Sequence, residues 1–160
     1  MCIRDRGVFS WRDAVYGTED CLTLDIVRPD TDDELPVVVY FHGGTFVTGA
    51  SNEKVLRGHF LAQATDIVYV SVNFRLGVLG YLDFRSIGDD CVANPAIWDQ
   101  IQSLEWVRDN IANFGGDPNR VTIMGESAGG AAVTHLMCAP AARGLFHGGI
   151  AQSPPSASVH

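Results

Sequence analysis

Hydrophobic residues along this chain alternate between strand-like runs and helical patterns. Residues 22–27 alternate apolar with polar positions, which is typical of a strand with one covered face. Residues 35–41 and 67–72 are almost wholly apolar, as in strands that are covered on both faces. Between these two runs, residues 52–64 carry apolar side chains at helical spacing. The first half of the chain is therefore predicted to form two strands, a helix and a further strand.

A second group of elements follows a predicted loop at residues 73–81. We expect a long helix from about Pro95 to about Asn113, because proline suits a first helical turn and apolar residues recur every three or four positions behind it. A short strand at residues 121–124, an Ala-rich helix at residues 128–137 and a strand beginning near residue 149 come next. Strands that alternate with helices indicate parallel pairing through right-handed crossovers. The predicted fold class is α/β, with helices on both faces of the sheet.

The composition agrees with one globular domain that has a sizeable core. The chain has 160 residues, of which 46% are hydrophobic and 19% are charged, which is too apolar for a disordered chain. No apolar run approaches the roughly 18 residues of a membrane span, so we expect no membrane-spanning segment. The net charge of −8 argues against nucleic acid or an anionic membrane as a partner, because both attract basic surfaces. All 19 acidic residues lie at or before Glu126.

The four cysteines, Cys2, Cys21, Cys91 and Cys138, form no CxxC pair and no cluster with histidine at zinc-ligand spacing. We therefore expect no metal site. Four cysteines allow three pairings, and their spacing does not choose among them. The first residues lack the apolar segment of a secretory signal peptide, and the sequence leaves the compartment open.

The segment with the clearest chemistry is GESAGG at residues 125–130, which contains the pattern G-x-S-x-G between a predicted strand and a predicted helix. Glycines two positions before and after Ser127 let the backbone turn sharply without Cβ clashes and leave the hydroxyl exposed. Ser127 is therefore the candidate nucleophile, and the Ala128 N–H is a candidate donor to an oxyanion. The alternative is that these small residues only begin a helix.

Further oxyanion donors are expected from the glycine loop HGGTF at residues 42–46, which ends the central strand. A phosphate-binding loop is the competing interpretation. It is disfavoured because the segment lacks the G-x-G-x-x-G pattern and no lysine follows. We expect the histidines at positions 42, 59, 135, 147 and 160 to be structural or solvated rather than catalytic.

Three stretches of the chain resemble the type B carboxylesterase and cholinesterase family. EDCLTLDIVRP at residues 19–29 is similar to the family's signature around a cysteine, and residues 114–130 are similar to its serine signature FGGDPxxVTIxGESAGG. NFRLGVLGYL at residues 73–82 completes the set. The resemblance implies the N-terminal part of an α/β-hydrolase fold, with a mostly parallel sheet and an antiparallel outer strand.

The same resemblance implies hydrolysis of a small-molecule carboxylic ester through an acyl-enzyme at Ser127, without a cofactor. The implied oxyanion donors are the backbone N–H groups of Gly44, Thr45 and Ala128. Thr45 departs from the family's usual Gly or Ala, and we expect its branched side chain to narrow the acyl pocket. The segments 93–96 and 152–155 also depart from the family's Gly-Asn-x-Gly and Gln-Ser-Gly.

The resemblance further implies two contacts. Arg75 is expected to pair with Asp99, either as a buried ion pair or as two solvated charges. The family's partner for Cys21 lies upstream in many members, which leaves a disulfide with Cys2 or an isolated buried Cys21 as the alternatives.

The sequence lacks part of the catalytic machinery that the resemblance implies. In α/β-hydrolases an acid and then a histidine follow the nucleophile in the chain, yet no acidic residue follows Ser127. We therefore interpret residues 1–160 as a partial domain that has at most trace activity alone, with residues 1–6 and 154–160 as candidate non-native ends. The alternatives are a non-catalytic cholinesterase-like adhesion or binding domain and an unrelated nucleotide-binding domain.

Overall fold

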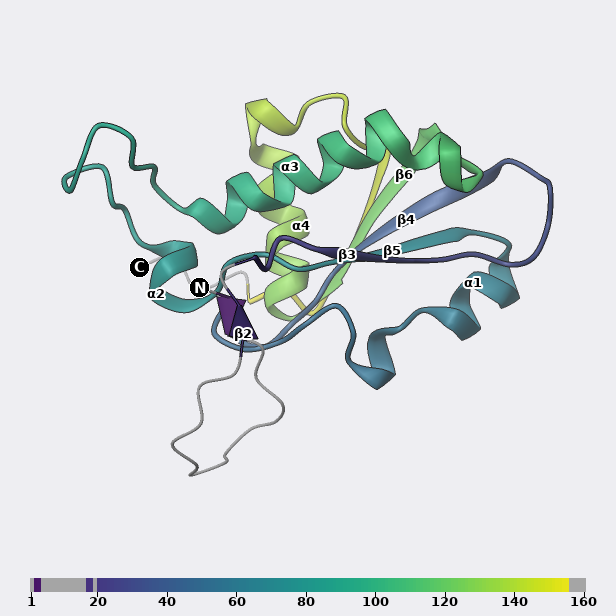
Figure 1. Ribbon diagram of the computed structural model, residues 1–160, viewed down its shortest axis with the longest axis horizontal. Coiled ribbons are helices and arrows are strands. Elements are labelled where there is room, and N and C mark those ends of the chain that lie inside the picture. Colours follow the sequence, from purple (N-terminus) through teal and green to yellow (C-terminus); the bar gives the residue numbers. More distant parts are fainter. Residues whose placement is uncertain (1, 4–16, 19, 156–160) are drawn as a thin grey trace.

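A five-stranded mixed sheet forms the centre of the part of the chain that the structure describes (Figure 1). This computed structural model describes residues 2–3, 17, 18 and 20–155, and describes side chains for residues 20–54 and 56–155. The strand order is β3-β5-β4-β6-β7. The strands are β3 (Leu24–Val27), β4 (Leu35–Phe41), β5 (Val68–Val72), β6 (Gly116–Glu126) and β7 (Gly148–Gln152).

Pairing within the sheet is parallel except at one edge, where β3 runs antiparallel to β5. This confirms the predicted mostly parallel sheet with an antiparallel outer strand. A separate antiparallel pair is formed by β1 (Cys2–Ile3) and β2 (Gly17–Thr18).

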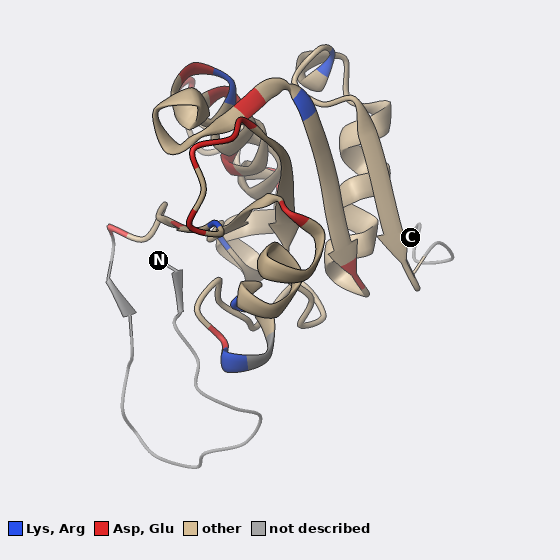
Figure 2. Cartoon of the chain, turned by 90° about the vertical axis from the view of Figure 1, so that its right-hand side faces the viewer, with Lys and Arg blue, Asp and Glu red and all other residues tan. Residues whose placement is uncertain are grey.

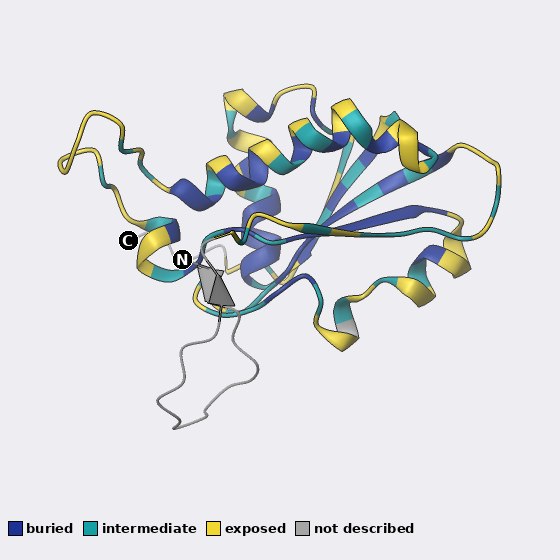
Figure 3. Ribbon diagram, in the orientation of Figure 1, coloured by how far each residue is buried: buried dark blue, intermediate teal, exposed yellow. Residues whose placement is uncertain are grey.

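Helices cover both faces of the sheet. They are α1 (His59–Thr65), α2 (Gly77–Tyr81), α3 (Pro95–Asn110) and α4 (Ala128–Cys138), with 3-10 turns at Lys54–Leu56, Ile111–Phe114 and Pro140–Ala142. Figure 1 shows α3 and α4 on one side of the sheet and α1 on the other. Their inward faces are buried and their outer faces are exposed (Figure 3). The predicted layers are therefore confirmed.

The core divides between the two faces as strand alternation requires. Val37, Val39 and Phe41 of β4 belong to the large cluster beneath α3 and α4, whereas Tyr40 belongs to a smaller cluster beneath α1. The predicted stripe of α3 also packs into the large cluster, with buried Ile101, Leu104, Val107 and Ile111 and half-buried Ile97.

Three predicted segments differ in the structure. Strand β6 begins at Gly116 rather than near residue 121, because Leu35 pairs with Gly116 and the register shifts before Val37 pairs with Val121. The helix predicted at residues 52–64 is divided at Gly58, whose φ is 70° and where a Cβ would lie 2.1 Å from the Tyr69 ring. The loop predicted at residues 73–81 contains the short helix α2.

The charged residues are unevenly distributed over this fold. Helix α4 and strand β7 carry no Asp or Glu, and the described acidic residues lie on β3, α3 and β6 and in the loops before Ser127 (Figure 2). No helix within residues 20–155 is both long and apolar enough to cross a membrane.

The cysteines differ in state. Cys21 is half-buried and disulfide-bonded, so the alternative of an isolated buried thiol was wrong. Its predicted pairing with Cys2 lies outside the described side chains. Cys91 and Cys138 are free thiols.

Candidate active site

Ser127 lies at the junction where β6 ends and α4 begins. Its backbone has φ 56° and ψ −120°, a conformation that is uncommon for a residue with a side chain. A Cβ on Gly125 would lie 2.3 Å from the Gly129 carbonyl oxygen, and a Cβ on Gly129 would lie 2.0 Å from the Phe41 carbonyl oxygen. The two glycines thus allow a close backbone approach, as the sequence predicted. The positive φ, however, falls on the serine itself.

Backbone hydrogen bonds fix this junction on both sides. The Ser127 N–H donates to the Gln152 carbonyl of β7 at 2.9 Å, and the Ser127 carbonyl accepts from the Ala131 N–H of α4 at 3.0 Å. Among the described residues, none hydrogen-bonds to the Ser127 hydroxyl, which leaves that group free to react with a ligand.

The glycine loop after β4 lies directly against Ser127. Strands β4 and β6 are neighbours in register, with Phe41 paired to Gly125, so their carboxyl ends meet. A Cβ on Gly43 would lie 2.9 Å from the Glu126 carbonyl oxygen and 3.5 Å from the Ser127 Cβ. The structure therefore brings the loop that carries the candidate donors to the candidate nucleophile.

The loop has an unusual backbone immediately after Gly43. Gly44, Thr45 and Phe46 all have positive φ, at 115°, 54° and 64°. A β-branched residue in this region is a conformational outlier. The Thr45 hydroxyl donates to the Gly44 carbonyl at 2.7 Å, a local bond that offsets part of this cost. The side chain is exposed, and its expected effect on an acyl pocket stays a prediction.

Helix α2 supports the far end of the glycine loop. The Gly77 N–H at the start of α2 donates to the Phe46 carbonyl at 2.7 Å, and the Phe46 and Tyr81 rings meet edge to face at 5.1 Å. This support was not predicted, because backbone hydrogen bonds between distant segments require no particular residue type.

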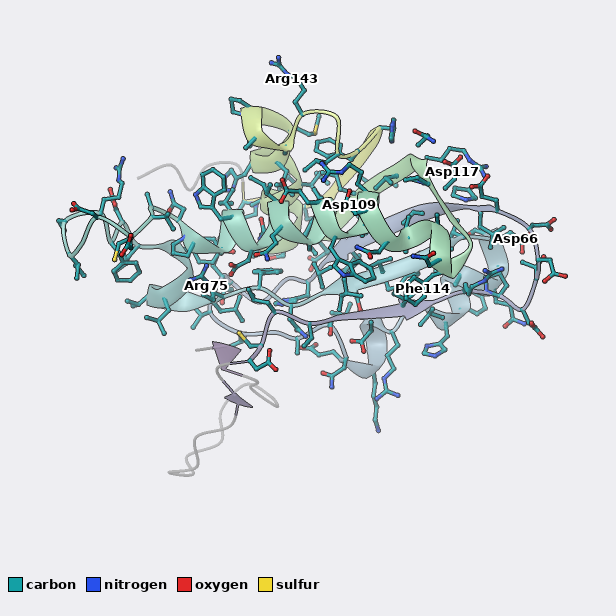
Figure 4. All side chains as sticks on the ribbon, turned by 45° about the horizontal axis from the view of Figure 1, so that its top comes forward. Asp66, Arg75, Asp109, Phe114, Asp117 and Arg143 are labelled. Carbon is teal, nitrogen blue, oxygen red and sulfur yellow. The ribbon has the colours of Figure 1, made fainter. Side chains whose placement is uncertain are left out.

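The predicted ion pair between Arg75 and Asp99 is present and anchors α2 to α3. Asp99 accepts from the Arg75 backbone N–H at 3.0 Å, from Nε at 2.8 Å and from Nη2 at 2.6 Å. The Asp99 side chain is 2% exposed and that of Arg75 is 35% exposed. This hydrogen bonding raises the pKa of Arg75 above its ordinary value. Figure 4 places Arg75 at the opposite end of the sheet from Phe114 and Asp117.

The described histidines have different environments. His42 is buried, His59 and His135 are exposed, and His147 accepts a hydrogen bond from the Val121 N–H through Nδ1 at 3.2 Å. None of the four bonds to the Ser127 hydroxyl. Among residues 20–155, no three side chains of His, Cys, Asp or Glu are grouped so that they could hold a metal ion.

Two acidic residues influence the hydroxyl of Tyr40. Burial raises the pKa of Tyr40, which lies on β4, and the charges of Glu126 and Glu53 raise it further.

Sequence and structure comparisons agree on the relationship of this chain to known proteins. A model of the carboxylesterase family matches residues 1–159. The chain is 43% identical to para-nitrobenzyl esterase of Bacillus subtilis (strain 168), over 89% of the chain and 29% of the relative. It is 46% identical to cocaine esterase of Homo sapiens, over 85% of the chain and 24% of the relative.

The solved structure of a thermophilic PNB esterase has a TM-score of 0.83 and 41% identity, over 87% of this chain and 29% of that one. The chain thus spans less than a third of the length of these relatives. Because the family model matches almost every residue and the fold is shared at this level of identity, the chain belongs to the carboxylesterase family of α/β-hydrolases.

Proposed function

We propose that the protein containing this chain hydrolyses carboxylic esters through a covalent intermediate on Ser127. The Ser127 oxygen attacks the ester carbonyl carbon, the tetrahedral intermediate collapses, and the alcohol leaves with a proton. Water then releases the carboxylic acid and regenerates the serine. The observation that carries this proposal is the sharp strand-to-helix junction, with half-buried Ser127 at φ 56° and Gly43 packed beside it.

The proposed oxyanion donors are the backbone N–H groups of Gly44, Thr45 and Ala128. Ala128 begins α4, and the partial positive charge of a helix N-terminus favours the developing anion. Loss of a single donor of this kind slows catalysis by about 10²- to 10³-fold in a well-studied hydrolase. The donors are therefore proposed to supply a large part of the rate enhancement.

The base that activates Ser127, and the carboxylate that orients it, are proposed to come from chain outside these 160 residues. No described histidine bonds to the Ser127 hydroxyl, and no acidic residue follows Ser127 in the sequence. Without the base, the serine hydroxyl is a weak nucleophile. Residues 1–160 alone are therefore expected to show at most trace turnover, arising from the oxyanion donors.

The proposed substrates are small-molecule carboxylic esters. Two relatives are named for para-nitrobenzyl esters and cocaine.

Labelling with a fluorophosphonate tests the proposal. In a longer protein that contains these residues, the reagent should label Ser127, and Ser127→Ala should abolish both labelling and hydrolysis of p-nitrophenyl acetate. The exposed Ser86 provides the matched control, and Ser86→Ala should leave both unchanged. Full-rate hydrolysis by the 160-residue chain alone would contradict the proposed external base, and full activity of Ser127→Ala would contradict the proposed nucleophile.

A further inference from the structure

Each candidate oxyanion donor is the N–H of a peptide unit whose carbonyl group accepts a hydrogen bond. Because a peptide unit is planar, its N–H and C=O groups point in opposite directions, and fixing the carbonyl fixes the direction of the N–H. The unit that carries the Ala128 N–H has the Ser127 carbonyl, which accepts from the Ala131 N–H at 3.0 Å. The first turn of α4 thus orients this donor.

The unit that carries the Thr45 N–H is held at its carbonyl in the same way. The Gly44 carbonyl accepts from the backbone N–H groups of Val47 and Thr48 at 3.1 and 3.0 Å. It also accepts from the hydroxyl groups of Thr45 and Thr48 at 2.7 and 3.2 Å. Two backbone groups and two hydroxyl groups therefore determine the direction of this donor.

The third unit, which carries the Gly44 N–H, depends on a side chain. Among the described residues, the Gly43 carbonyl has one hydrogen-bond partner, the Nδ1 of His42 at 2.8 Å. A carbonyl oxygen can only accept, so Nδ1 must carry the proton, and a neutral ring then leaves Nε2 unprotonated. Nε2 is buried and has no partner, which agrees with a ring that carries no second proton.

The ring of His42 is held in place by its neighbours. It stacks on Phe74, with ring centroids 4.5 Å apart and planes 12° apart. Gly49 leaves room for the ring edge, because a Cβ there would lie 2.2 Å from the His42 Nδ1. Burial lowers the pKa of His42 below its ordinary value, so the ring is neutral at neutral pH. His42 is 2% exposed, and water does not compete for its bond.

From these contacts we infer that His42 is a positioning residue: its Nδ1–H holds the Gly43–Gly44 peptide so that the Gly44 N–H faces the oxyanion. The inference rests on the proposed function, and it gives a role to a histidine that the sequence analysis assigned to structure alone. A hydrogen bond at the carbonyl also polarises the peptide and strengthens its N–H as a donor.

Nuclear magnetic resonance of the 160-residue chain tests the geometry without any turnover. The imidazole ¹⁵N shifts should show His42 with its proton on Nδ1, and a through-bond coupling should connect Nδ1 to the Gly43 carbonyl carbon. His42→Leu should shift the Gly43 carbonyl and Gly44 amide resonances. His42→Asn should restore them in large part, because the Asn amide places a donor near the position of Nδ1. His135→Leu, which replaces an exposed histidine, is the control and should leave them unchanged.

Acylation of the same variants tests the role in reactivity. With excess p-nitrophenyl acetate and Ser127→Ala as the blank, intact mass should detect slow acylation of Ser127. We expect His42→Leu to slow it by about tenfold or more, since a displaced donor loses part of its effect. His42→Asn should remain within about threefold of wild type, and so should His135→Leu, which replaces an exposed histidine.

Several outcomes would overturn the inference. They are a proton on Nε2, unchanged Gly43 and Gly44 resonances in His42→Leu, or an equal loss of acylation in the Leu and Asn variants of His42. If Ser127→Ala hydrolyses esters at the wild-type rate in the longer protein, the proposed function fails, whereas the resonance data still decide whether His42 orients the peptide.

Discussion

Ser127, the proposed nucleophile, has a backbone conformation that costs free energy. A residue with a side chain at φ 56° and ψ −120° is held there by its surroundings, at a cost of order 1–3 kcal/mol. The bonds to Gln152 and from Ala131 provide that restraint. This strain should be measurable as a stability difference.

Two substitutions at Ser127 separate the cost of backbone strain from the effect of losing the hydroxyl. Ser127→Ala removes the hydroxyl but keeps the Cβ, whereas Ser127→Gly removes both. The glycine variant should therefore be more stable than the alanine variant by about 1 kcal/mol. Urea unfolding of the two variants measures this difference, and equal stability would show that the backbone at Ser127 is unstrained in solution.

The buried ring of His42 should make stability depend on pH. Its folded pKa lies below the unfolded value of about 6.5, so the unfolded chain binds the proton more readily. The contribution of His42 is therefore fully present above about pH 6.5 and declines as the pH falls toward the folded pKa. The charge of Glu53 opposes the shift in part.

Unfolding free energies measured from pH 8 to pH 5 check this dependence. Relative to His42→Asn, which cannot take up the proton, the wild type should lose stability progressively below pH 6.5. His135→Asn replaces an exposed ring and serves as the matched control. If the difference in unfolding free energy between wild type and His42→Asn does not change with pH, the folded ring takes up the proton as readily as the unfolded one.

At the scale of elements, the site depends on contacts that hold short segments to longer ones. Helix α2 has five residues and is held by the bond of Arg75, two residues before it, to Asp99 and by the edge-to-face contact of Tyr81 with Phe46. An isolated helix of this length is unstable. Its position, and with it the support of the Phe46 carbonyl, follows from these tertiary contacts.

Removing Asp99 should therefore destabilise the fold. The Arg75 guanidinium is 35% exposed and can regain water, so Asp99→Ala should cost less than the 3–5 kcal/mol of a fully buried pair, at about 2 kcal/mol. Asp109→Ala, on the same helix, breaks a pair with Arg108 in which both side chains are at least half exposed, and should leave stability unchanged. Denaturant unfolding of both variants checks the contrast, and equal effects would argue against a buried role for Asp99.

At the scale of the molecule, strand β7 ends the sheet without protection. No described strand pairs with its outer edge, and it carries no charged residue. Edges of this kind favour pairing between chains. A lysine on the edge opposes such pairing, because its charge would be buried.

Self-association of the 160-residue chain should therefore rise with concentration and fall in Ile150→Lys. The Ile150 side chain is 45% exposed, so the substitution should leave the fold intact. Val78→Lys, at a 63% exposed position on α2, is the control for added charge away from this edge. Sedimentation velocity measures the effect, and a monomer at all concentrations would show that the β7 edge is protected.

Much of the fold followed from the sequence because the period of apolar residues records which faces are buried. Strand β4 was predicted at its observed bounds, and the α3 stripe was predicted residue by residue. The ends of β6 and the break at Gly58 were not, since they depend on backbone pairing and on contact with Tyr69. Neither contact leaves a periodic pattern.

The sequence by itself indicated the family, the order of the five sheet strands with helices α3 and α4, and the segment with the candidate nucleophile, because these depend on residue types at fixed spacing. Only the tertiary structure decided that Ser127 itself takes the positive φ and that α2 holds the Phe46 carbonyl. It also decided that the His42 ring bonds to the Gly43 carbonyl. These features are backbone conformations and hydrogen-bond directions. They arise only when the sheet brings the ends of β4 and β6 together, so the spacing of residues along the chain does not predict them.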